Sequence, residues 1–218
     1  KLIDQHLKGL TQRGPAGVKA AEFFNTLDNR LAIKRIYELL QKDLSRTDWY
    51  MELLAKMSEN SANWVFVDIA MNSPNSQLVN QAIELLERTE ASREFAFHTF
   101  LNVIGNPKSK PSAVDRAGSN LQSFVDKRAI PTLIGRLVSI VTIKSTQQAT
   151  NSISSDGGIA QNFGNATVES KSRVKHPSVL SSLLSVVHGV NFEYNIPEWR
   201  IWYANTFAKF NMDLRRDE

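Results

Sequence analysis

The residues best suited to chemistry are scattered along this chain. Its four histidines are His6, His98, His176 and His188, and none stands in a metal-binding pattern such as H-E-x-x-H. The lack of cysteine excludes disulfides, thiolate ligands and a cysteine nucleophile. Glycine-rich phosphate-binding patterns and the G-x-S-x-G nucleophile pattern are also missing. We therefore predict that the protein is not an enzyme and has no cofactor and no metal site.

Acidic residues gather at Glu84, Glu87, Glu90 and Glu94, spaced by about one helical turn. A general acid–base pair requires a shielded site that shifts a pKa. Arginines are interleaved with these glutamates, as on a solvated helix face. We interpret the cluster as surface rather than as a catalytic pair.

Positive charge is concentrated in the middle of the chain. The formal net charge is +4, and residues 108–175 carry ten basic and four acidic residues. Such a segment complements an acidic protein, a nucleic acid or an anionic lipid, and an ordinary solvated surface is the alternative interpretation. The candidate partner-binding residues are Arg128, Arg136, Lys144, Phe163, Lys171, Arg173 and Lys175.

The elements that must position these residues are mostly helical by pattern. Apolar residues recur at the i, i+3, i+4, i+7 spacing of a helix packed on one face. The clearest example is the stretch 126–138, whose apolar positions, continued to residue 141, are Ile130, Leu133, Ile134, Leu137, Val138 and Val141. This spacing predicts a helix that leads out of the basic segment.

Similar segments begin near residues 31, 47, 62, 76, 92, 112 and 128. Helices that start about every 15 residues favour helical hairpins stacked into a solenoid, because one hairpin alone cannot bury its apolar face. An irregular all-α bundle is the alternative. The predicted fold class is thus all-α, and the leading arrangement is an α-solenoid.

The composition suits such a domain. The chain has 218 residues, of which 42% are hydrophobic and 22% charged, as in an ordinary soluble globular protein. No apolar run approaches the roughly 18 residues needed to span a bilayer. Because the chain begins at Lys1 rather than at methionine, we expect a fragment or a processed mature protein.

A polar insertion near residues 141–175 interrupts the helical pattern. Its first part, Ile140–Thr146, is rich in β-branched residues and predicts a strand. Asp156-Gly157-Gly158 predicts a turn, and Asn165–Lys171 predicts the return strand of a long hairpin. A disordered loop rich in Ser, Asn and Gln is the alternative.

A helical pattern resumes after the insertion. Pro197 suits the first turn of a last helix, along which an aromatic stripe predicts core packing at the C-terminal end. The stripe consists of Trp199, Trp202, Tyr203, Phe207 and Phe210. We predict one domain with four parts: an N-terminal segment (1–30), helical repeats (31–143), a polar arm (144–175) and capping helices (176–218).

Two segments carry a family resemblance. Val114–Leu121 followed by Arg128–Ile134 resembles a helix pair of bacterial HEAT-like repeat proteins, in which an Arg-x-x-Ala helix precedes an Ala-Ile/Val-Pro-x-Leu-Ile helix. Asn191–Ala204 resembles the Asn-Phe…Trp-Arg-x-Trp-Tyr ending of such proteins, where a polar insertion also precedes the tail. Over residues 112–204 the resemblance implies a bacterial α-solenoid with binding surfaces rather than a reaction. Many of these proteins are exported, so it also implies the periplasm or cell surface.

The leading functional hypothesis is a non-catalytic module that binds another protein, with the polar arm as its contact. A nucleic-acid-binding solenoid that uses Arg116, Arg128 and Arg136 is the alternative. An active site assembled from residues far apart in sequence is a third.

Overall fold

The computed structural model describes most of the chain, and its described residues are mostly helical. The described residues are 2–10, 15, 19–20, 22–23, 30–42, 44–57, 61–124, 126–147, 152–153, 159–160 and 166–207. Among them, no helix combines the length and the apolar character that a membrane crossing requires.

The helices before the polar insertion are short and closely spaced. They are α1 (Leu2–Leu10), α3 (Arg30–Lys42), α4 (Thr47–Lys56), α5 (Asn63–Asn72), α6 (Ser76–Glu87), α7 (Glu90–Gly105), α8 (Pro111–Leu121) and α9 (Ile130–Gly135). Two single 3-10 turns precede α4 and α9, namely η1 (Leu44–Arg46) and η2 (Lys127–Ala129). The predicted starts from residue 31 to residue 128 are confirmed to within about two residues.

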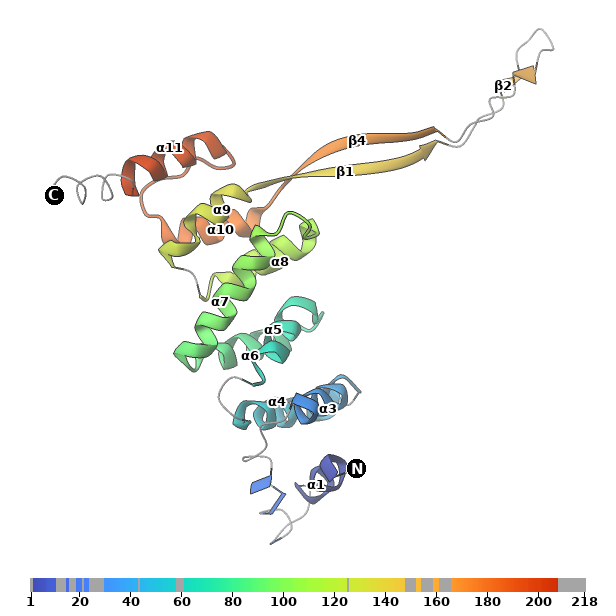
Figure 1. The fold of residues 1–218 in the computed structure, drawn as a ribbon, viewed down its shortest axis with the longest axis vertical. Helices are drawn as coiled ribbons and strands as arrows, with labels where there is room; N and C mark the ends of the chain where they lie inside the picture. Colours follow the sequence, from blue (N-terminus) through green and yellow to red (C-terminus); the bar gives the residue numbers. More distant parts are fainter. Residues whose placement is uncertain are drawn as a thin grey trace, which may run out of the picture.

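The helices follow one another along the long axis of the molecule in chain order (Figure 1). Consecutive helices pack as pairs, α3 with α4, α5 with α6, α7 with α8, and α9 with α10 (Pro177–Val186). Contacts also join alternate helices, since α5 touches α7, α7 touches α9, and α8 touches α10. Buried apolar side chains form one cluster that runs from Ala32 to Trp199.

Helix α9 is shorter than its apolar stripe predicts. It ends at Gly135, and strand β1 (Val138–Gln147) begins three residues later. The extension of the helix to Val138 and Val141 is therefore wrong. β-Branched residues lose side-chain freedom in a helix and fit a pleated strand, so the run from Val138 to Ile143 pairs as a strand instead.

The predicted hairpin is confirmed over its two long strands. Strand β1 pairs antiparallel with β4 (Ala166–Lys175) over ten residue pairs, from Val138 opposite Lys175 to Gln147 opposite Ala166. The short strands β2 (Ser152–Ile153) and β3 (Ile159–Ala160) pair further out. The predicted turn at 156–158 lies outside the described residues. The β1–β4 hairpin projects away from the stacked helices (Figure 1).

The hairpin returns to the body through α10, which packs closely on α8 at a glycine. A Cβ built on Gly118 would lie 2.9 Å from the backbone nitrogen of Val179. The buried Ser182 hydroxyl donates to the Gly118 carbonyl at 2.6 Å. Only a residue without a side chain lets the two backbones approach this closely.

Substitution of Gly118 by alanine should therefore destabilise the fold by about 1–3 kcal/mol, because α8 and α10 must separate to admit the methyl group. The measurement is urea denaturation followed by circular dichroism. Gly135→Ala is the matched control, since a Cβ there meets nothing within 4 Å. Equal stabilities for the two variants would contradict the close packing.

The last described helix, α11 (Ile196–Phe207), covers the end of the stack and contacts α9. Trp199 is completely buried, whereas Trp202, Tyr203 and Phe207 are half-buried and pack against the same core. The predicted core role of the aromatic stripe is confirmed for these four residues. Phe210 lies outside the described residues.

Candidate functional site

The β1–β4 hairpin collects basic side chains on one side. Residues opposite each other in an antiparallel pair lie on the same face, and the register places Thr142 opposite Lys171 and Ile140 opposite Arg173. Lys175 follows at the same period of two. We call these five residues the basic face. All five are exposed, and Ile140 is 67% exposed.

The candidate residues of the hairpin differ in their surroundings. No hydrogen bond or ion pair to another described residue engages Lys171 or Arg173. The Lys175 ammonium lies 4.7 Å from the centre of the Tyr194 ring, so it is held at the base by a cation–π contact. Lys144 stands in β1 opposite Glu169. Phe163 lies outside the described residues.

The other candidates, Arg128 and Arg136, belong to the helical body. Arg128 forms a two-pronged ion pair with Glu94, at 2.6 and 3.2 Å, and its Nε donates to Asp126 at 2.6 Å. Its guanidinium also lies 4.7 Å from the centre of the Phe97 ring. Hydrogen bonds to both acids raise the pKa of Arg128, and its donors lower the pKa of Glu94.

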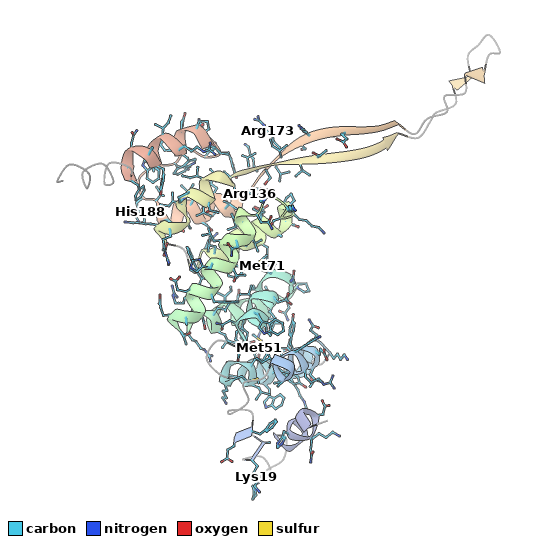
Figure 2. The ribbon with its side chains drawn as sticks, in the orientation of Figure 1. Lys19, Met51, Met71, Arg136, Arg173 and His188 are labelled. Carbon is cyan, nitrogen blue, oxygen red and sulfur yellow. The ribbon has the colours of Figure 1, made fainter. Side chains whose placement is uncertain are left out.

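Arg136 and Arg116 both donate to backbone carbonyls. Arg136 Nη2 lies 3.3 Å from the Ser109 carbonyl. Arg116 donates to the carbonyl of Ala70 at 2.9 Å and to that of Ser73 at 2.5 Å, which satisfies carbonyls at the C-terminal end of α5. Figure 2 shows Arg136 where the body meets the hairpin and Arg173 on the hairpin itself.

A buried polar cluster fixes the base of the hairpin to the body. The Ser139 hydroxyl in β1 lies 2.6 Å from His176 Nε2, and His176 Nδ1 lies 3.1 Å from the Asp115 carboxylate in α8. His176 is fully buried and Ser139 is 5% exposed. We call these three residues the anchor. They join β1, the residue after β4, and α8 at one point.

Hydrogen-bond chemistry explains why the anchor suits this place. A carboxylate only accepts, so His176 Nδ1 donates to Asp115 and Nε2 faces a hydroxyl that can donate or accept. The anchor therefore keeps both bonds whether the ring is neutral or protonated. The His176 amide also donates to the Leu137 carbonyl at 3.0 Å, which extends the β1–β4 ladder by one pair.

The anchor has the Ser–His–Asp order that acyl-transfer enzymes use. A nucleophilic serine must also reach its substrate and lie beside donors that stabilise an oxyanion. Ser139 is 5% exposed instead, and three cavities among the described residues, of about 250, 440 and 100 Å³, are lined by residues from α3 to α8 that do not include it. The three residues of the anchor thus join β1 to α8, as a structural clamp does.

Sequence reasoning missed the anchor because its members are far apart in the chain. Ser139 and His176 are separated by 37 residues, and His176 and Asp115 by 61. One local signal was present, since a histidine between a strand and Pro177 at the start of α10 stands at a junction of elements.

No protein-family model, curated protein or solved structure matches this chain. The resemblance to HEAT-like repeat proteins and the bacterial origin therefore stay predictions. In the described part of the chain, no group of three or more His, Cys, Asp or Glu side chains is arranged to hold a metal ion.

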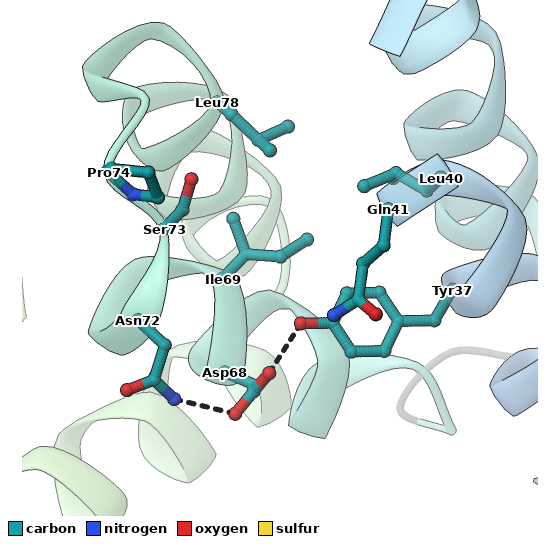
Figure 3. Close-up of a pocket in the computed structure, with 9 residues that line it drawn as sticks. All are labelled: Tyr37, Leu40, Gln41, Asp68, Ile69, Asn72, Ser73, Pro74 and Leu78. Carbon is teal, nitrogen blue, oxygen red and sulfur yellow. Dashed lines mark hydrogen bonds between the residues drawn. The ribbon is translucent and has the colours of Figure 1, made fainter. Parts of the chain in front are cut away.

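A cavity of about 250 Å³ lies between α3, α5 and α6, away from the hairpin (Figure 3). Its apolar walls come from Leu40, Ile69 and Leu78. At its polar end the Tyr37 hydroxyl donates to the Asp68 carboxylate, which also accepts from Asn72 Nδ2 at 2.8 Å. The cavity is smaller than most ligand pockets, and its polar groups bind one another.

Tyr37 should show its environment in alkaline solution. Burial, followed by the hydrogen bond and charge of Asp68, raises the pKa of Tyr37 from 10.0 to about 12. A folded-state pKa above the unfolded one contributes stability below pH 10 that is lost as the pH rises towards 12. The free energy of unfolding of the wild type should fall more steeply over this range than that of Tyr37→Phe. Tyrosinate absorbance, compared between the two proteins, should assign the late-titrating phenol to Tyr37, and identical slopes would contradict this.

The glutamates that we interpreted as surface residues lie in two different environments. Glu84 is exposed and Glu87 half-exposed beside a groove between α6 and α8. Glu94 instead pairs with Arg128, and its carboxylate also lies 3.2 Å from the exposed His98.

Proposed function

We propose that this protein is a non-catalytic interaction module whose β1–β4 hairpin contacts another protein. The observation that carries the proposal is the projection of a ten-pair, two-stranded ladder from a helical body (Figure 1). Strands β1 and β4 contact chiefly each other. An isolated two-stranded hairpin is at best marginally stable in water, so a further surface that covers it would stabilise it.

The way the hairpin is attached supports a positional role. The anchor links the buried Ser139 of β1, through the buried His176 that follows β4, to the half-buried Asp115 of α8, and so holds the base of the hairpin against the body. A chain that only needed a loop between α9 and α10 would not require a buried histidine there. A fixed base gives the outer part a defined direction, as a contact element needs.

We infer that the body is a HEAT-like α-solenoid. Support comes from the two series of contacts, one along α5, α7, α9 and α11 and another that joins α8 to α10 and α4 to α6. Nearest-neighbour packing of this kind is how solenoid repeats build a continuous core. The proposed role of the body is to carry the hairpin in a larger assembly.

The nucleic-acid alternative is less well supported. Arg116, Arg128 and Arg136, on which it depends, donate to carbonyls or carboxylates of the body itself. Phosphate binding would have to compete with these bonds. Other exposed cations, such as Lys171 and Arg173 in the hairpin or Lys108 and Lys110 in the body, would have to take such a role.

The test is to remove the hairpin while keeping its base. Replacing residues 140–173 by Asn-Gly joins Ser139 to Val174, a register pair, through a two-residue turn and leaves the anchor intact. The variant should keep its helical circular dichroism and its cooperative unfolding. It should lose the partner that the full chain captures from extract of its own organism, identified by mass spectrometry. Capture of the same partner by a folded hairpin-less variant would rule the proposal out.

A further inference from the structure

The hairpin exposes an edge whose backbone groups and cations point to one kind of partner. Leu137 and His176 form a hydrogen-bonded pair, because the His176 amide donates to the Leu137 carbonyl in the register of the ladder. Hydrogen-bonded and non-hydrogen-bonded pairs alternate along an antiparallel ladder. The pairs that contain Lys171 and Arg173 are therefore of the second type. Their own N–H and C=O groups face away from β1, along the outer edge of β4.

A strand that joined this edge would bond to the backbone of Lys171 and Arg173. Its residues opposite them would then lie on the basic face, two positions apart, with a repeat of about 7 Å. Carboxylates at those positions would meet two exposed cations that have no ion pair to any described residue.

Taking the proposed function as a premise, we propose that the partner of β4 is a strand with acidic residues at alternate positions, added to its outer edge. Main-chain hydrogen bonds would supply affinity, and the alternate acidic residues would supply selection. The outer edge of β1 is a poorer candidate for an acidic strand, since the β1 residues opposite Arg173 and Lys171 are the uncharged Ile140 and Thr142, and the next residue on that side, Lys144, stands opposite Glu169.

A second copy of this chain suits the same edge less well than an acidic strand. In the registers centred on residues 171 to 173, pairing of β4 with another β4 would place Lys171 and Arg173 opposite each other or opposite themselves, and like charges directly opposite destabilise a sheet. A register centred on Ser170 would offer each Lys171 a single carboxylate, that of Glu169. Basic residues on an edge strand discourage indiscriminate pairing. The same positive charges attract an acidic strand, so the outer edge of β4 favours acidic partners over basic ones.

A single-stranded nucleic acid fits the basic face less well. Binding without base readout combines cations with aromatic side chains on which the bases stack. The basic face instead places Ile140 and Thr142 beside its cations. Nucleic-acid binding is thus an outcome that the test must be able to detect.

The test uses the full chain and synthetic peptides as probes. One peptide alternates glutamate with threonine, and its isomer has the same composition with the glutamates contiguous. The alternating peptide should bind about twofold to thirtyfold more tightly, the range expected for two cross-strand charge pairs. N-methylation of the alternating peptide at one of its two sets of alternate amides should abolish binding, because that set would donate to β4, whereas N-methylation at the outward-facing set should be tolerated. Equal affinity for the two isomers, or binding that survives N-methylation at both sets, each tested in its own peptide, would overturn the proposal.

Charge reversal gives an independent readout. The double variant Lys171→Glu, Arg173→Glu should lose the glutamate peptide and instead prefer a peptide that alternates lysine with threonine, a gain that a misfolded hairpin cannot produce. The matched control reverses the exposed Lys34 and Lys127, which lie in the helical body, and should keep the original preference. Preferential binding of a thymidine oligonucleotide over every peptide, lost on reversal of Lys171 and Arg173, would also overturn the proposal.

The two proposals can fail separately. If replacement of residues 140–173 abolishes partner capture but the peptides show no preference, the proposed function stands and the acidic-strand partner is wrong. If partner capture survives that replacement, the proposed function itself is wrong.

Discussion

Replacing Trp199 by alanine should lower the free energy of unfolding by about 3–5 kcal/mol, the range for a fully buried tryptophan. Trp199 has no exposed surface, and edge-to-face contacts join its ring to Phe192 at 5.1 Å and to Trp202 at 5.7 Å. Its Nε1 donates to the Glu193 carbonyl at 2.8 Å, so the same ring holds the loop before α11. Truncation removes the packing and this hydrogen bond together.

Urea denaturation of the full chain measures the effect. Ile201→Ala is the control on the same helix, because Ile201 is 62% exposed and should change stability by less than about 0.5 kcal/mol. If the Trp199 variant lost no more stability than the Ile201 variant, α11 would not close the stack as described.

Replacing His176 by alanine should cost about 2–3 kcal/mol and loosen the base of the hairpin. The substitution leaves the Ser139 hydroxyl buried without its partner and removes the Asp115 contact, and an orphaned buried polar group costs about 1–3 kcal/mol. The loss of the imidazole also leaves a cavity between β1, α8 and α10. Ser139→Ala should cost less, because it deletes the hydroxyl together with its bond.

Two measurements separate the anchor from a general packing effect. Denaturation should show the loss for His176→Ala and not for His188→Ala, since His188 is exposed. Hydrogen exchange should accelerate at the ladder amides of β1 and β4, while amides of α5 keep their protection. Unchanged exchange in the strands would contradict a clamping role.

Local sequence patterns predict most of the helices and the hairpin. The helix starts from α3 to α9 follow from apolar periodicity, and the hairpin follows from the run rich in β-branched residues, Ile140–Thr146. The end of α9 was misplaced because Leu137 and Val138 continue the apolar stripe of a helix. Val138 also begins the strand run, and pairing with β4 decides between the two.

The candidate site was only partly predictable, because charge pattern does not say which cations are already paired. Lys171, Arg173 and Lys175 were found by composition, and their common face follows from the period of two along a strand. The ion pair between Arg128 and Glu94 joins residues 34 positions apart, and no local sequence pattern indicates it. The same holds for the Arg116 contacts with carbonyls at the end of α5.

The hydrogen-bonded pair of Leu137 and His176 means that the chain leaves the helical body and rejoins it at neighbouring points. The helical body holds together the two ends of the segment between these residues. The entropic cost of closing that segment depends little on its length, since doubling the length of a loop adds only about 0.6 kcal/mol. The helical body can thus carry recognition segments of different length and sequence at this position without changes to its core. Variation among related proteins, and grafting by an engineer, should concentrate there.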